Sequence, residues 1–166
     1  MKVMVAYMSQ SGNTKKVAEA IFREIQADKE LKELSDLEAL EGHDLYFVGF
    51  PIQGYGPANP AKVLLEQHAA GKDIALFVTH ASPEDGDLLP EWLAACRDAA
   101  VGANIVGMFN CQGELAQNVA DFMKSSGDDQ LAAWAEDRPD TIGQPDAARL
   151  ERARGFAREV MGKYPA

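Results

Sequence analysis

The sequence contains few cysteines. Its 166 residues include only Cys96 and Cys111, and neither belongs to a Cys-x-x-Cys pair. Disulfide frameworks and cysteine zinc sites need several cysteines at suitable spacing, so the sequence supports neither kind of site. We therefore expect two reduced thiols that pack as small apolar side chains, and no metal centre.

Long apolar runs are also missing. No stretch approaches the roughly 20 apolar residues that a membrane-spanning helix requires. The first ten residues, MKVMVAYMSQ, lack the apolar segment and small-residue cleavage site of a signal peptide, and they suit a first strand instead. From these absences we expect a cytoplasmic protein without membrane insertion.

Basic residues are outnumbered by acidic ones. Lys and Arg total 16 against 26 Asp and Glu, which gives a formal net charge of −10. A chain of this charge repels the phosphate backbone of nucleic acids, so we expect no nucleic-acid partner. The same charge favours solubility and association with a basic surface on another protein.

The sequence does contain a regular alternation of apolar runs and amphipathic segments. Near-continuous apolar runs predict buried strands at residues 2–7, 44–50, 73–79 and 103–110. Apolar residues at helical spacing predict four helices. Two of them start at Thr14 and Pro60, one spans residues 88–100, and the last carries Leu150 to Val160. The segment LKELSDLEAL fits either a helix or a short second strand, and EDRPDTIGQPD (136–146) is expected to be irregular.

This alternation predicts an α/β fold in which helices cover both faces of an open parallel sheet. The length suits one domain, which we expect to span residues 1–166. In open parallel sheets, ligands bind beyond the carboxyl ends of the strands. The loops PIQGYG, HASPEDGD and NCQGE are expected at that edge, together with the hexapeptide SQSGNT (9–14).

SQSGNT joins the first strand to the first helix and contains no basic side chain. A helix N-terminus binds anions through unpaired N–H groups and the helix dipole, so a phosphate site needs no lysine there. Gly12 allows a tight turn, and the hydroxyls and Asn13 add further donors. The alternative is an ordinary capped turn, which uses the same residue types. The patterns GxxxxGK[ST] and GxGxxG are both missing, which excludes a triphosphatase loop and a dinucleotide fingerprint.

SQSGNTKKVAEAI, directly after a first strand, resembles the phosphate loop of the flavodoxin family, whose usual pattern is Ser/Thr-x-Ser/Thr-Gly-Asn-Thr. YFVGFPIQGYGPANPAK and DIALFVTHASPEDGD resemble the third and fourth flavodoxin strands with their two flavin loops. NIVGMFNCQGEL and PDAARLERARGFAREV are more similar to flavodoxin-like domains of anaerobic bacteria than to the best-known electron carriers. The resemblance implies a flavodoxin-like three-layer sandwich with a five-stranded parallel sheet of strand order 2-1-3-4-5.

The resemblance implies FMN as the cofactor. The phosphate would lie on the loop 9–14, and the isoalloxazine between the loops 51–57 and 80–87. Gly54 or Gly56 is the candidate for the peptide flip at flavin N5, and Tyr55 is the candidate for stacking on the ring. The expected cofactor residues are Ser9, Gln10, Ser11, Gly12, Asn13, Thr14, Pro51, Ile52, Gln53, Gly54, Tyr55, Gly56, His80, Ala81, Ser82 and Asp85.

The second flavin loop departs from the usual family pattern because it carries no Tyr or Trp, so one face of the ring is expected to be more open. His80 is either a titrating group beside the flavin or a hydrogen-bonded structural histidine. Glu84, Asp85 and Asp87 form an acidic rim that lowers the flavin potential if it lies near N1 and has little effect if it faces water.

These expectations favour an electron-transfer protein that binds FMN, shuttles low-potential electrons between redox partners, and docks on a basic partner surface. No side chain is assigned a catalytic role, because the flavin carries the chemistry. One alternative is an FMN-dependent reductase of quinones or other small acceptors. Another is a binding or regulatory domain of the same fold without redox activity.

Overall fold

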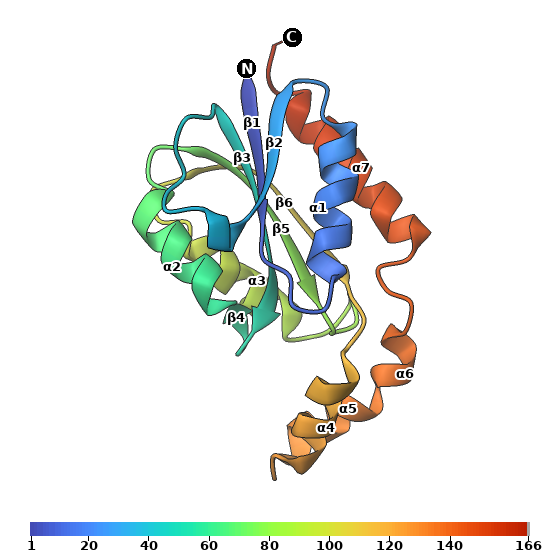
Figure 1. Cartoon of the computed structure of the whole chain (residues 1–166). Coiled ribbons are helices and arrows are strands. Elements are labelled where there is room, and N and C mark those ends of the chain that lie inside the picture. Colours follow the sequence, from blue (N-terminus) through green and yellow to red (C-terminus); the bar gives the residue numbers. More distant parts are fainter. Residues whose placement is uncertain (166) are drawn as a thin grey trace.

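The apolar runs form parallel strands that meet at a common carboxyl edge. In the computed structural model, which describes residues 1–165, the strands lie in the order β2-β1-β3-β5-β6 (Figure 1). Their bounds are β1 Lys2–Tyr7, β2 Asp28–Glu33, β3 Leu45–Gln53, β5 Asp73–His80 and β6 Asn104–Gln112. The short strand β4 (Gly56–Pro57) pairs antiparallel with the end of β3. The predicted five-stranded parallel sheet of order 2-1-3-4-5 is therefore confirmed, with β4 as an addition.

Helices cover both faces of this sheet, as the alternating pattern predicts. One face packs on α1 (Asn13–Glu24) and α7 (Ala147–Met161), through a core that includes Ile21, Phe47 and Phe156. The other face packs on α2 (Asn59–His68) and α3 (Leu89–Asp98), through Leu65, Leu76 and Cys96 among others. Figure 1 shows these layers as the three-layer sandwich expected from the sequence.

The segment after α1 resolves the ambiguity in LKELSDLEAL. β2 begins at Asp28, before that segment, and ends at Glu33, where the one-turn 3₁₀ helix η1 (Leu34–Asp36) follows. β2 is an edge strand that pairs only with β1, Met4 opposite Glu30. An edge strand with one covered face tolerates alternating polar residues, which explains why its sequence carries no continuous apolar run.

Three short helices stand between β6 and α7, at the carboxyl edge of the sheet (Figure 1). They are α4 (Gln117–Ser125), α5 (Asp129–Glu136) and α6 (Arg138–Thr141). The first two were not expected, and the third interrupts the segment 136–146 that was predicted to be irregular. Residues 114–146, which contain these helices and the links at both ends, are called the helical cap below.

The longest helix of the chain closes the fold. α7 has 15 residues and returns along the sheet beside α1, with Ala153, Phe156, Ala157 and Val160 buried. Its remaining faces carry charged residues, including four arginines. Among residues 1–165, no helix combines the length and the apolar character needed to cross a membrane.

Candidate functional site

The loop 9–14 leaves the N-terminus of α1 open. Gly12 is the N-cap with φ 95°, a left-handed conformation that glycine adopts without a steric penalty, and no side chain caps the helix. The Gly12 N–H donates to Ser9 Oγ at 3.1 Å, which closes the turn. Within residues 1–165, the N–H groups of Asn13, Thr14 and Lys15 find no protein acceptor. These free donors stand at the positive end of a 12-residue helix, an arrangement suited to an anion.

Two side chains of this loop are used inside the protein. Asn13 Nδ2 donates to the Glu114 carbonyl oxygen at 2.9 Å, and Thr14 Oγ1 lies 2.8 Å from Thr79 Oγ1 in a buried position. Both bonds hold the backbone of the loop in place. The N–H groups therefore remain as the main donors for a ligand, joined by the exposed or half-buried side chains of Ser9, Gln10 and Ser11.

A cavity of about 430 Å³ opens over this loop. Its walls come from the ends of β1, β3 and β5 and from the start of the helical cap, and its volume lies within the roughly 300–1,000 Å³ usual for small-molecule sites. The expected residues on these walls are Ser9, Gln10, Ser11, Asn13, Thr14, Pro51, Ile52, Gln53, His80 and Ala81. Glu114, Leu115, Ala116, Asn118 and Val119 of the cap line it as well, together with Thr79.

Six expected residues lie outside these walls: Gly12, Gly54, Tyr55, Gly56, Ser82 and Asp85. Gly54 and Tyr55 form the two-residue turn between β3 and β4, and both have positive φ, 61° and 67°. Positive φ at both central residues is the requirement of a type I′ hairpin turn. The turn points Tyr55 at Trp92 of α3 and Trp134 of α5, with ring centroids 5.5 and 6.1 Å away.

Tyr55, Trp92 and Trp134 form one aromatic cluster, since the two tryptophan rings are themselves 5.7 Å apart. Three segments that are distant in sequence supply these rings, and all three pairings have the tilted or edge-to-face geometry that aromatic side chains prefer. The cluster therefore fastens α5 to the β3–β4 hairpin. Trp92 and Trp134 therefore act as packing residues.

His80 ends β5 and is buried in the wall of the cavity. Its Nδ1 lies 3.0 Å from the Ser82 carbonyl oxygen, and its Nε2 lies 2.9 Å from Asn110 Oδ1. A carbonyl oxygen only accepts, so Nδ1 carries the proton. Burial lowers the pKa of His80, although the bonds to Asn110 and Ser82 oppose that shift. A lowered pKa favours the neutral form of the ring at pH 7.

The acidic rim expected at 84–87 is partly neutralised. Glu84 accepts from Arg152 Nη2 at 2.7 Å and from Arg149 Nε at 3.0 Å, both on α7. The charges of these arginines lower the pKa of Glu84 in spite of its partial burial. Glu84 thus ties the second loop to α7, whereas Asp85 and Asp87 are exposed.

The helical cap roofs the cavity and is fastened at its base. The Leu115 N–H donates to Thr141 Oγ1 and the Leu115 carbonyl accepts from Arg138 Nε, both at 2.9 Å. The Glu114 N–H donates to the Gln144 carbonyl at 2.9 Å. A small core of Leu115, Ala120 and Ala135 lies behind these bonds, with Ala81 of the second loop against it. Sequence reasoning placed NCQGE at this edge but missed the wall that follows it, because no local pattern shows that the chain turns back there.

The two cysteines are both buried. Burial raises the pKa of the Cys111 thiol, and of Cys96, to about 12. Cys111 packs in the core beneath α7, and Cys96 is on the buried face of α3. Their surroundings support the interpretation of both as small apolar side chains.

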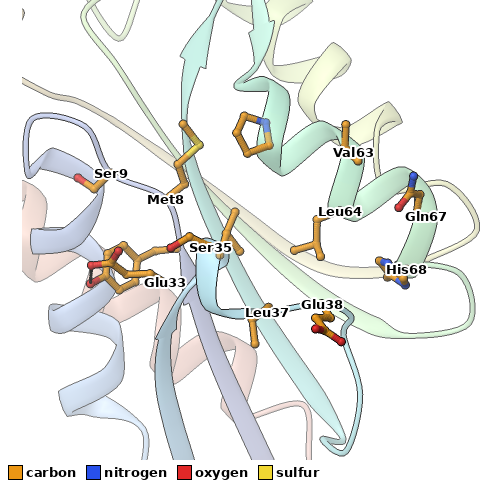
Figure 2. Close-up of a pocket in the computed structure, with 13 residues that line it drawn as sticks. Met8, Ser9, Glu33, Ser35, Leu37, Glu38, Val63, Leu64, Gln67 and His68 are labelled. Atoms are coloured by element: carbon orange, nitrogen blue, oxygen red, sulfur yellow. Dashed lines mark hydrogen bonds between the residues drawn. The ribbon is translucent and has the colours of Figure 1, made fainter.

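A second hollow of about 420 Å³ lies between η1, the end of β1 and α2 (Figure 2). Val63, Leu64, Gln67 and His68 of α2 line one side, and the carboxylates of Glu33 and Glu38 line the other. Of the loop 9–14, only Ser9 reaches it. Two carboxylates repel an anion, so the cavity over the α1 N-terminus is the site suited to a phosphate.

A family model described as a flavodoxin domain matches residues 4–158. A curated relative, the flavodoxin-like domain-containing protein BilS of Clostridioides difficile (strain CD3), is 30% identical over 174 residues. That alignment covers 98% of each protein. The sequence similarity thus extends over nearly the whole chain, including the helical cap.

Solved structures share the fold. Oxidised flavodoxin 2 of Bacillus cereus is similar with a TM-score of 0.68 and 20% identity, covering 99% of this chain and all of that one. A flavoprotein of Lactobacillus acidophilus NCFM, solved in complex with FMN, is similar with a TM-score of 0.52 and 26% identity. That likeness covers 66% of this chain and 92% of the other protein.

Proposed function

Because the chain belongs to the flavodoxin family, we propose that it is an electron-transfer protein that shuttles low-potential electrons between redox partners. FMN, the cofactor predicted from the sequence, is the cofactor of this family. When bound, FMN supplies a ring that accepts and donates electrons. The protein contributes binding, orientation and exclusion of water.

One observation carries the proposal: the uncapped N-terminus of α1 opens into a cavity of about 430 Å³ at the carboxyl edge of a doubly wound sheet. The free N–H groups of Asn13, Thr14 and Lys15 would bind the phosphate without a basic side chain. This donor set fits a single phosphate group. A longer phosphate chain usually requires a lysine or a metal ion, and SQSGNT supplies neither.

The remaining walls suit the rest of the cofactor. Pro51, Ile52 and Gln53 would lie on one side of the ring and His80 and Ala81 on another, while Leu115 and Val119 of the cap would exclude water. His80 enters this contact as a neutral, hydrogen-bonded ring and adds no charge near the flavin. Tyr55 would reach the ring only by leaving its contacts with the two tryptophans.

We further propose that the redox partners present a basic docking surface and that the protein works in the cytoplasm. The net charge of −10 supports the first part, because complementary charge speeds the encounter of two proteins. An acidic carrier and a basic partner form short-lived complexes that salt weakens. Such complexes suit repeated rounds of electron transfer.

The test is a titration of the flavin-free protein with FMN, followed by quenching of flavin fluorescence, with riboflavin as the matched ligand that lacks the phosphate. We expect FMN to bind at least about 100-fold more tightly than riboflavin, since an anion on a helix N-terminus makes several charge-assisted bonds. Equal binding of the two ligands, or none at micromolar concentration, contradicts the proposal. The loaded protein is then mixed with NADPH: rapid oxidation with a quinone acceptor favours the reductase alternative, and slow oxidation favours the carrier.

A further inference from the structure

The negative charge of the chain is concentrated in the helical cap. Residues 114–146 contain eight Asp or Glu and two Lys or Arg, a net charge of −6 out of −10 for the whole chain. Six of the eight acidic residues are exposed: Asp121, Asp128, Asp129, Glu136, Asp137 and Asp140. The two basic residues are engaged, because Lys124 lies 3.6 Å from Glu136 and Arg138 donates to the Leu115 carbonyl.

The cap also carries a large exposed apolar side chain. Phe122 of α4 is 67% exposed, and it is the most exposed of the large apolar residues among those described. Val119, one helical turn earlier on the same side of α4, is 41% exposed and also lines the cavity. Val119 and Phe122 therefore form an apolar strip that runs from the cavity wall to the outer surface.

An apolar strip inside an acidic surface has the composition of a docking site. Protein interfaces place apolar and aromatic side chains at the centre and polar or charged side chains at the rim. Phe122 and Val119 supply the centre, and the exposed carboxylates of the same cap, beginning with Asp121 beside Phe122 on α4, supply the charge. Association that covers Phe122 removes its apolar ring from water, which favours binding.

We propose that the helical cap is the surface on which a redox partner docks, and that this partner presents an apolar contact surrounded by lysines and arginines. This inference rests on the proposed function, since it assigns the docking site of the same cofactor cavity. The cap forms a wall of that cavity, so a partner seated on Val119 and Phe122 lies beside the cavity. Electron transfer between two proteins requires a short path of this kind.

The charge favours this occupant over a second copy of the chain. Two copies would bring two surfaces of net charge −6 together, and like charges at an interface are unfavourable. A basic partner gains from the same field, both in its rate of approach and in the choice of orientation.

The first experiment maps the surface by NMR. The ¹⁵N-labelled protein, loaded with FMN and separately without it, is titrated with oxidised cytochrome c, a basic haem protein used as the probe, at about 20 mM ionic strength, where charges act over roughly 20 Å. We expect the largest amide shifts and line broadening within residues 117–140, in both forms. Shifts centred on another acidic region, or no binding at this ionic strength, would overturn the proposal.

The second experiment uses matched variants. Phe122→Ser removes the apolar centre, and Val101→Ser is its control, because Val101 is 57% exposed at the opposite edge of the sheet. Asp121→Asn with Asp129→Asn removes two rim charges, and the control pair is Asp98→Asn with Glu159→Gln, also exposed but remote from the cap. We expect F122S to weaken probe binding at least about fivefold and the cap pair about threefold, with little change in the controls.

The outcomes separate the inference from the proposed function. Equal effects of cap variants and controls overturn the docking surface, even if FMN binds as expected. If the wild type does not bind FMN, the proposed function is contradicted. The NMR titration of the flavin-free protein still locates its contact with the probe in that case. Persistence of the charge effect at about 300 mM salt would also contradict the inference, because screening should remove it.

Discussion

Gly49 shows how closely the sheet packs behind the site. It stands opposite Phe77 across β3 and β5, and a Cβ added there would lie 1.9 Å from Phe77 Cε2. The Phe77 ring is fully buried, so it has no room to move aside. The absence of a side chain at residue 49 is therefore a packing requirement.

Gly49→Ala is expected to lower the free energy of unfolding by about 1–3 kcal/mol, the usual effect of overpacking a core. Gly155→Ala on α7 is the matched control, because its nearest neighbour, Arg158 Nη2, lies 3.8 Å from the added Cβ. That substitution should stabilise the protein by about 0.5–1 kcal/mol, since alanine favours a helix. Urea unfolding followed by circular dichroism measures both, and a shift of the same sign in the two variants would contradict the packing argument.

His80 gives the site a pH dependence. Burial lowers its pKa below that of the unfolded chain, with Arg149 lowering it further and Glu84 raising it. Below the unfolded pKa of about 6.5, the unfolded state binds a proton that the folded state does not, so stability falls as the pH decreases until the folded pKa is reached. We expect the wild type to lose more unfolding free energy than His80→Gln between about pH 7.5 and 5.5. Equal losses of unfolding free energy in the two proteins would show that groups other than His80 determine the pH dependence of stability in this range.

At the scale of elements, the helical cap is held by few attachments. Hydrogen bonds of Leu115 with Thr141 and Arg138 join the two ends of the cap at its base. Asn13 Nδ2 attaches the base to the loop 9–14, and Trp134 packs against Tyr55 and Trp92. The small core of the cap includes Ala120 and Ala135, whose short side chains bury little apolar area. The aromatic cluster therefore provides a large share of the local stability.

Trp134→Ala is expected to speed hydrogen exchange of amides in residues 117–141 by at least about tenfold, which corresponds to about 1.4 kcal/mol of local stability. Amides of β5 should keep their wild-type rates, because the sheet does not depend on the cap. Val101→Ser serves as the control, since it alters an exposed apolar residue away from the cluster. If hydrogen exchange in the cap stays unchanged, the hydrogen bonds at the base of the cap are enough to stabilise it.

The same elements explain what the sequence could predict. The strands of residues 2–7, 44–50, 73–79 and 103–110 were predictable because both faces of each are covered, which demands continuous apolar runs. The open N-terminus of α1 behind the turn 9–14 was predictable because its donors are local to one turn and one helix end. α4 and α5 were missed because their contacts are tertiary: Trp134 binds a distant hairpin, and alanines carry much of their core.

The residues of the site also fall into those that the sequence could predict and those that it could not. Ten of the 16 expected residues line the cavity, since they lie on loops fixed by strand ends. Tyr55 lies elsewhere because a type I′ turn and two tryptophans determine its direction, and neither constraint is visible in GYG. The walls at Glu114 and Val119 belong to the cap, so they could be found only from the folded chain.

At the scale of the whole molecule, the phosphate site and the net charge oppose each other. The loop 9–14 contains no charge, the chain carries −10, and FMN brings a phosphate of about −1.5 to −2 at pH 7. A phosphate site rich in lysine attracts its ligand from a distance, and salt slows that attraction. Here the long-range field repels the ligand, and only the short-range N–H groups attract it. Lys15 and Lys16 are exposed beside the loop and act against this field locally.

We therefore expect the rate constant of FMN association to rise about two- to fivefold between about 10 and 200 mM NaCl, as screening reduces the repulsion. Riboflavin, which is uncharged, should associate at a rate that changes little with salt. Lys15→Gln with Lys16→Gln should steepen the rise for FMN, because the variant loses the two positive charges nearest the loop. Stopped-flow quenching of flavin fluorescence measures all three rates. An FMN rate that falls with salt in the wild type would mean that local positive charge, and not the net charge of the molecule, steers the cofactor to its site.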